Sequence, residues 1–242
     1  MSYSSIYDDF SSSTYPKMRV REPNKLISWF KKNEFKEAQK KKEVGSVLPE
    51  EDHFLLHYLQ LDMSNGPWIA GGCALDWYLG QPTNQLGDID VFFKDIDQFA
   101  KFHREFNKKI SGNKVSTFET ANAISYTIIF NDRKRISRKI QLIKKFFTSP
   151  SDLLANFDLN ICQVLTDSKS FVFGPTTEED IKTKTLRYLR KPQQGSLRRI
   201  IKYQLYGYRP DEKLCNELET NPDFYTTKNL ALHEHDEYEA GI

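Results

Sequence analysis

The chain has 242 residues, enough for one large domain or for a domain with a smaller appendage. Of these residues 38% are hydrophobic, and 17 Phe and 12 Tyr can build a hydrophobic core. Its 35 basic and 33 acidic residues leave a formal net charge of +2, so a charged partner must be recognised by local patches. No stretch reaches the roughly 20 apolar residues of a membrane span. The three Cys are too scattered for a disulfide framework. We therefore expect a cytoplasmic protein without a membrane partner.

The N-terminal quarter of the chain contains no strand signal. Residues 1–23 are Ser-rich and aperiodic, which predicts a flexible arm. Residues 24–65 contain two stretches with helical apolar spacing, and Pro49 stands near the first turn of the second. We therefore expect a helical segment before the first strand.

Residues 66–175 alternate between strand and helix signals. Strands are predicted at 67–72, 88–93, 123–130 and 139–147, and helices at 73–80 and 95–110, the second with helical spacing from Ile96 through Phe99 to Phe106. A basic turn joins the last two strands. This order predicts an α/β (α+β) head with a mixed sheet.

The strand signals stop after about residue 175. Residues 176–230 read as helices interrupted from Pro192 to Gly195, with Ser196 as the expected N-cap of the following helix. Residues 231–242 form an acidic tail, in which His233 and His235 have the spacing of metal ligands; a mobile tail is the alternative reading.

Two acids, Asp88 and Asp90, stand on a strand that otherwise consists of core residues. Side chains two residues apart on a strand point to the same face, so the two carboxylates are expected about 5 Å apart, where they repel by roughly 3 kcal/mol at an effective dielectric constant near 20. A divalent cation removes this repulsion, and Mg²⁺ favours one or two carboxylates completed by water and phosphate oxygens. The alternative is a pair of solvated acids at the end of a strand.

The glycine pair Gly71-Gly72 lies at the predicted turn from the first strand to the first helix. Without Cβ atoms a phosphate can approach the backbone, and the N–H groups at a helix start point toward an anion. A tight turn with close packing is the alternative. A phosphate-binding turn followed by a carboxylate pair is the minimal equipment for phosphoryl or nucleotidyl transfer.

The segment "GGCALDWYLGQPTNQLGDID" resembles the signature of class II nucleotidyltransferases, the CCA-adding and bacterial poly(A) polymerase group of the DNA polymerase beta superfamily. Seven residues match in order: Gly71, Gly72, Asp76, Leu79, Gly80, Asp88 and Asp90. The resemblance implies a mixed-sheet nucleotidyltransferase head followed by a helical C-terminal neck. It also implies Mg²⁺ or Mn²⁺ as the cofactor, held by the catalytic acids Asp88 and Asp90.

Further residues match less closely. The resemblance implies that the NTP contacts Gly71, Gly72 and the following N–H groups from Cys73, the segment around Asp158, and Arg198 and Arg199 of the neck. The family pattern is not met where Leu75, Cys162 and the pair Asn156-Phe157 stand. A later strand offers the neutral Gln141 at the position where many superfamily members carry a third acid; Asp158 or Glu119 could supply that ligand instead.

Two basic stretches could contact RNA. The resemblance places a basic helix in the neck, and the turn before the last strand is strongly basic, so the candidate RNA contacts are Arg133, Lys134, Arg135, Arg138, Lys139 and Lys202. A solvated hairpin edge explains the turn equally well. Tyr203 and Tyr206 could stack on bases, with core packing as the alternative.

These observations predict a metal-dependent nucleotidyltransferase that moves a nucleoside monophosphate from an NTP to an RNA 3′ end, possibly of tRNA. Gln141 and the altered family positions motivate the alternatives. These are a catalytically impaired relative that binds RNA, a nucleotide or another protein, and a transferase whose acceptor is a protein hydroxyl.

Overall fold

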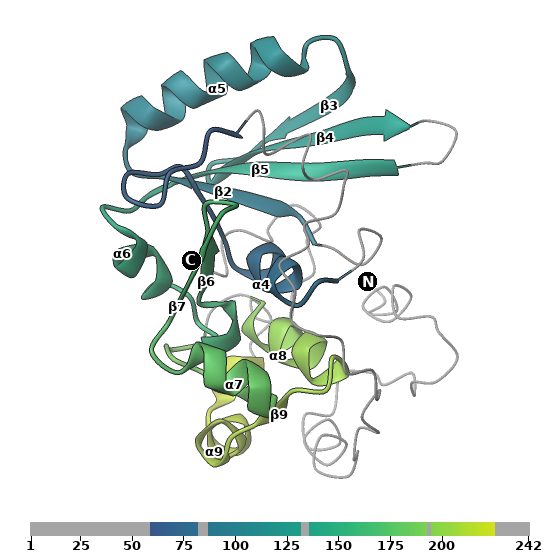
Figure 1. Ribbon diagram of the computed structural model, residues 1–242. Coiled ribbons are helices and arrows are strands. Elements are labelled where there is room, and N and C mark those ends of the chain that lie inside the picture. Colours follow the sequence, from purple (N-terminus) through teal and green to yellow (C-terminus); the bar gives the residue numbers. More distant parts are fainter. Residues whose placement is uncertain (1–58, 82–86, 132–135, 193–194, 226–242) are drawn as a thin grey trace. The chain divides into compact units, whose positions relative to one another are not determined.

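A computed structural model describes residues 59–81, 87–131, 136–192 and 195–225 (Figure 1). The expected arm, most of the 24–65 segment, the basic residues Arg133, Lys134 and Arg135, and the acidic tail with His233 and His235 lie outside the described residues. The chain forms two compact units. The larger unit includes residues 59–183 and 188–190 of the described part, and the smaller unit includes 184–187 and 191–225.

The larger unit is built on a seven-stranded sheet in the order β3-β4-β5-β2-β1-β6-β7 (Figure 1). Its strands are β1 (Trp68–Ala70), β2 (Ile89–Phe93), β3 (Lys114–Glu119), β4 (Ala123–Asn131), β5 (Ile136–Phe146), β6 (Val164–Thr166) and β7 (Phe171–Phe173). β2 and β5 run parallel, whereas the other pairs of this sheet are antiparallel. The predicted mixed sheet is therefore confirmed.

The helices of the larger unit are α4 (Gly72–Tyr78), α5 (Ile96–Ile110), α6 (Pro150–Leu154) and α7 (Thr177–Thr183), with the 3₁₀ turn η2 (Asn160–Cys162). Helix α5 covers one face of the sheet (Figure 1) because its periodic apolar side is buried there. The ring of Phe93 meets those of Phe99 and Phe102 at centroid distances of 5.2 and 5.1 Å. The Asp95 side chain caps the helix by accepting from the Gln98 N–H at 2.8 Å.

Three strands of this sheet were not predicted. β3 shows no buried alternation because its side chains are almost all exposed, and β6 and β7 have three residues each, too few for a period to show. Helix α5 and strands β2, β4 and β5 were predicted, although β5 begins at Ile136, inside the stretch read as a turn.

The smaller unit contains β8 (Thr185–Leu186), α8 (Ser196–Leu205), β9 (Arg209–Pro210), α9 (Glu212–Thr220) and the turn η3 (Pro222–Tyr225). The expectation that strands end near residue 175 is wrong, because β8 and β9 pair in parallel. The expectation that Ser196 caps α8 is also wrong: Gly195, with φ 74°, is the N-cap residue and Ser196 is the fully buried first residue of the helix. In the described part of the chain, no helix has the length and apolar character needed to cross a membrane.

Candidate functional site

The acids Asp88 and Asp90 lie at the start of β2, in the middle of the larger unit's sheet. Ile89 and Val91 are fully buried, whereas Asp88 and Asp90 are half-buried. This alternation is the one predicted for a strand, and it places both carboxylates on the same face of β2.

The neighbour of Asp90 across the sheet is Gln141 of β5. Gln141 in turn pairs with Ser125 of β4, and its Nε2 donates to Ser125 Oγ at 3.0 Å. Paired residues of adjacent strands project from the same face, so Asp90, Gln141 and Ser125 form one polar row across three strands. Gln141 is 2% exposed, so the row presents a buried neutral amide beside the carboxylates.

Asp88 carries a counter-charge within the protein. Lys139, two residues before Gln141 on β5, places its Nζ 2.9 Å from Asp88 Oδ2, and the two side chains are 33% and 26% exposed. This ion pair neutralises one of the two acids. Lys139, which was predicted to contact RNA, is therefore directed to the carboxylate pair.

The glycine bend lies at the same end of the sheet as the two acids, because β1 runs antiparallel to β2 with Ile69 opposite Val91. Gly71 has φ 83°, a conformation that favours glycine, and a Cβ there would lie 3.1 Å from Phe157 Cε1. The Gly71 N–H donates to Val164 O at 2.9 Å and is therefore engaged within the sheet, whereas the predicted contact of Gly71 with the NTP stays a prediction. Gly72 and Cys73 follow as the first residues of α4, and the N–H groups of a helix's first turn point toward its N-terminal end.

Helix α4 is tied to the residue before the first acid. Asp76 Oδ2 accepts from the Gly87 N–H at 3.4 Å, and Arg138 Nη1 donates to Gly87 O at 3.1 Å. Arg138 Nη2 lies 3.9 Å from Cys73 Sγ. Arg138 is only 4% exposed, so its guanidinium is not on the surface where an RNA backbone would bind, contrary to its prediction as an RNA contact. Its contacts instead hold the loop that carries Asp88.

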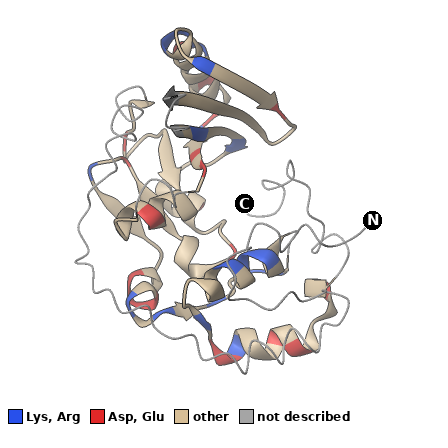
Figure 2. Cartoon of the chain, turned by 90° about the vertical axis from the view of Figure 1, so that its right-hand side faces the viewer, with Lys and Arg blue, Asp and Glu red and all other residues tan. Residues whose placement is uncertain are grey.

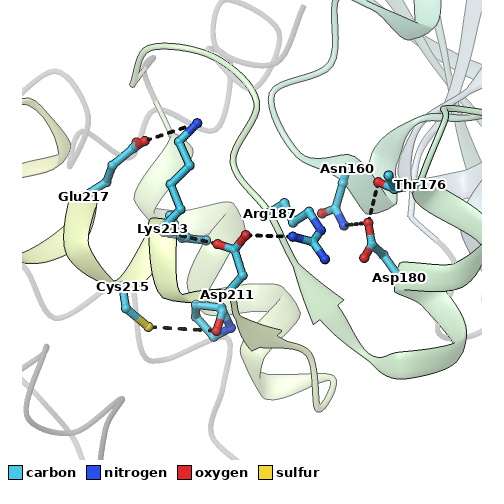
Figure 3. A network of polar contacts seen from close by, with 10 residues as sticks. Asn160, Thr176, Asp180, Arg187, Asp211, Lys213, Cys215 and Glu217 are labelled. Atoms are coloured by element: carbon cyan, nitrogen blue, oxygen red, sulfur yellow. Dashed lines mark hydrogen bonds and ion pairs between the residues drawn. The ribbon is translucent and has the colours of Figure 1, made fainter.

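Asp158 lies just before η2 and is 1% exposed, and its backbone oxygen accepts from the Leu189 N–H at 2.8 Å. The segment is anchored by a buried network shown in Figure 3, in which Asp180 Oδ2 accepts from Asn160 Nδ2 at 2.8 Å and from Thr176 Oγ1 at 2.6 Å. Residues 157–167 are all buried, so the Asp158 carboxylate is enclosed within the protein, and its predicted nucleotide contact stays a prediction.

Among the residues that the structure describes, no third acid joins Asp88 and Asp90. Over the described residues, no group of three or more His, Cys, Asp and Glu side chains could hold a metal ion. Asp158 is enclosed, and Glu119 Oε1 accepts from Lys144 Nζ at 2.7 Å. Two carboxylates are a ligand set that a divalent cation accepts when water and phosphate oxygens complete its coordination, and Lys139 would have to release Asp88 for both acids to bind the ion.

The predicted contacts of the neck lie in the smaller unit, on α8, which carries basic segments in Figure 2. Arg198 is exposed, whereas Arg199 and Lys202 are half-buried. Tyr203 is buried and 53% of Tyr206 is exposed, so Tyr206 is the tyrosine of this helix that a base could reach. These contacts stay predictions.

Sequence reasoning missed Ser125 and Phe157 as neighbours of the site. Ser125 reaches it through the β4–β5 register, and Phe157 through its contact beside Gly71. Both contacts join segments that are far apart in the sequence, so no local sequence pattern predicts them.

Comparison with known proteins gives a family and a fold. The model of the "Gabija anti-defense 2 family protein" matches residues 28–184. No curated protein matches the chain. Among solved structures, the Thermotoga maritima CCA-adding enzyme complexed with tRNA is similar, at 16% identity and a TM-score of 0.52 over 84% of this chain and 45% of that one. A CCA-adding enzyme complexed with ATP is similar at 16% identity and a TM-score of 0.51, over 71% and 42% of the two chains.

The chain thus has the fold of a CCA-adding nucleotidyltransferase head and spans less than half the length of these enzymes. At this identity the similarity concerns the fold alone.

Proposed function

The chain belongs to the Gabija anti-defense 2 family, and we propose that it is a metal-dependent nucleotidyltransferase that moves a nucleoside monophosphate from an NTP to an acceptor. The observation that carries the proposal is the pair Asp88 and Asp90 on one face of β2, at the sheet end where the Gly71 bend lies. The fold shared with CCA-adding enzymes supports it.

Asp88 and Asp90 would hold Mg²⁺ or Mn²⁺, which when bound supplies charge stabilisation for phosphoryl chemistry. The first N–H groups of α4, at Gly72 and Cys73, would face the triphosphate. Asp76 and Arg138 hold Gly87, the residue before Asp88. Lys139 balances Asp88 until the cation binds.

The proposed acceptor is an RNA 3′ end. The two similar solved structures are named as CCA-adding enzymes, one bound to tRNA and one to ATP, which is why we place tRNA among the candidate acceptors. Arg198, Arg199 and Lys202 of α8 remain the proposed contacts to the triphosphate and RNA. A hydroxyl on a protein of the Gabija system is the second acceptor, because the family is named for anti-defense against Gabija.

A binding module without catalysis is the second candidate function. Two observations favour it: Gln141 beside Asp90 is a neutral amide that cannot accept the proton of an attacking hydroxyl, and Asp88 already has a lysine partner. A module of this kind would bind the nucleotide or RNA without turning it over.

The test is incubation of the full chain with each labelled NTP and Mg²⁺ or Mn²⁺, with total RNA in one arm and Gabija proteins in the other. Asp88→Asn/Asp90→Asn removes both charges with little change in volume. Asp97→Asn on the exposed side of α5 is the matched control. We expect label in one arm, lost in the double variant and kept in the control.

Incorporation that survives in Asp88→Asn/Asp90→Asn would refute the assigned site. Retained nucleotide or RNA binding without any incorporation would favour the binding module instead. The arm that carries the label identifies the class of acceptor.

A further inference from the structure

Two cations from distant parts of the larger unit converge on one residue. Arg190 Nη1 donates to the backbone oxygen of Asn156 at 2.7 Å and to Asn156 Oδ1 at 3.2 Å. Lys145 Nζ, from the end of β5, donates to the same Oδ1 at 3.3 Å. Both cationic side chains are exposed, so further N–H groups face solvent.

The partners that hold these cations are neutral. A carbonyl and an amide oxygen satisfy hydrogen bonds but cancel no charge, and within the described residues neither cation forms an ion pair. Asp152, the acid of this neighbourhood, uses Oδ2 to accept from the Thr148 N–H and hydroxyl at 3.0 and 3.3 Å. The cluster of Lys145 and Arg190 at Asn156 is therefore a local excess of positive charge.

The charge of Arg190 also acts on the Lys145 ammonium, although less than burial does. Partial burial, followed by the charge of Arg190, lowers the pKa of the Lys145 ammonium, and Asp152 opposes this shift only in part. A bound polyanion would cancel the repulsion and favour the charged amine. Phosphate is suited to this position because it accepts hydrogen bonds from the Arg fork and the Lys ammonium at once.

The position of the cluster connects it with the proposed site. Asn156 is followed by Phe157, whose ring lies 3.1 Å from the position that a Cβ at Gly71 would take. Lys145 lies on β5 beyond Lys139 and Gln141, because Gln141 pairs with Asp90 whereas Phe146 pairs with Phe93. The cluster therefore lies farther along β5 than the residues beside the acids, and Phe157 connects it with the bend.

We propose that Lys145 and Arg190, held together by Asn156, form a phosphate-binding subsite that takes the terminal phosphates of the NTP. The subsite rests on the proposed function for its ligand, but its binding can be measured without any transfer reaction. An RNA backbone phosphate has the same chemistry, so the experiment separates the two sources.

The experiment measures binding of inorganic tripolyphosphate, and separately of single-stranded RNA, to the full chain by calorimetry at low salt. Lys145→Met and Arg190→Gln remove the charges but keep most of each stem. Lys145→Arg keeps the charge. Lys101→Met, on the exposed side of α5, is the control for loss of a surface charge.

We expect tripolyphosphate binding to weaken about tenfold for each charge removed, the loss expected for a charge-assisted hydrogen bond, and to stay near the wild-type value in Lys145→Arg and Lys101→Met. Unchanged binding in Lys145→Met/Arg190→Gln with wild-type thermal melting would overturn the subsite. If Arg190→Gln fails to fold, Lys145→Met decides alone.

A loss of RNA affinity with unchanged tripolyphosphate affinity would overturn the NTP assignment. Conversely, a wild-type chain that binds tripolyphosphate through these two residues but transfers no nucleotide would uphold the subsite while the transferase proposal fails.

Discussion

Replacing Gln141 by Glu tests whether the polar row faces a cation. The substitution puts a third carboxylate beside Asp90, its partner in the β2–β5 register. Neighbouring strands lie about 4.8 Å apart, so the two charges would repel by roughly 3 kcal/mol at an effective dielectric constant of 20. We expect Gln141→Glu to lower the free energy of unfolding by about that amount in EDTA.

Magnesium should reverse this loss. Three carboxylates bind a divalent cation more tightly than two, and at an ion concentration of about 100 times Kd the bound ion returns about 2.7 kcal/mol to the folded state. For a chain of this size, about 3 kcal/mol corresponds to a melting-temperature difference of roughly 6–12 °C. Thermal unfolding with EDTA and with Mg²⁺ measures both effects.

The pH dependence of the free energy of unfolding is a second test of Gln141→Glu. Burial and the Asp90 charge raise the pKa of the introduced carboxyl in the folded state above its unfolded value of about 4.3. In EDTA the loss of stability should therefore be absent below that pH and grow as the pH rises through the folded pKa. Gln141→Leu, which adds no charge, should lack this pH effect and should be stabilised by magnesium no more than the wild-type chain. Equal melting of Gln141→Glu with and without Mg²⁺ would refute the cation site.

Three further substitutions test the supporting structure. Gly71→Ala should cost about 1–3 kcal/mol in urea unfolding, because φ is 83° and the added Cβ would lie 3.1 Å from Phe157; a neutral result would mean that the bend is not as described. Asp180→Ala should cost about 2–3 kcal/mol in the same assay by leaving the fully buried Asn160 amide without its acceptor, and a loss near zero would contradict the network. Burial raises the pKa of Tyr225 to about 12, so the folded phenol stays neutral while the unfolded one ionises near 10, and stability should fall as the pH rises from about 10 toward 12. Tyr225→Phe should remove this dependence and one tyrosine that ionises near pH 12 from an absorbance titration.

The sequence predicted what local periodicity determines. Helix α5 followed from its three- and four-residue spacing of Phe, and the common face of Asp88 and Asp90 followed from strand alternation. Both patterns are complete within one element.

What could not be predicted depends on register between distant strands. The Lys139–Asp88 ion pair and the Gln141–Ser125 hydrogen bond exist because β5 lies between β2 and β4. From the sequence, Arg138 was expected to be one more exposed cation in a basic run, but within β5 its side chain is buried and contacts Gly87 O and Cys73 Sγ. A run of charges along the chain does not show which of them folds inward.

The parallel pairing of β2 with β5 also has a consequence for assembly. Every residue of α5, β3 and β4 is synthesised between the acids and their neighbours on β5. Bringing such distant segments together costs loop-closure entropy before their contacts can form. We therefore expect the row of Asp90, Gln141 and Ser125 to form slowly during folding. A nascent chain whose exposed portion ends before β5 would hold its acids without lysine or amide beside them, and would acquire the complete row only as the central strand inserts.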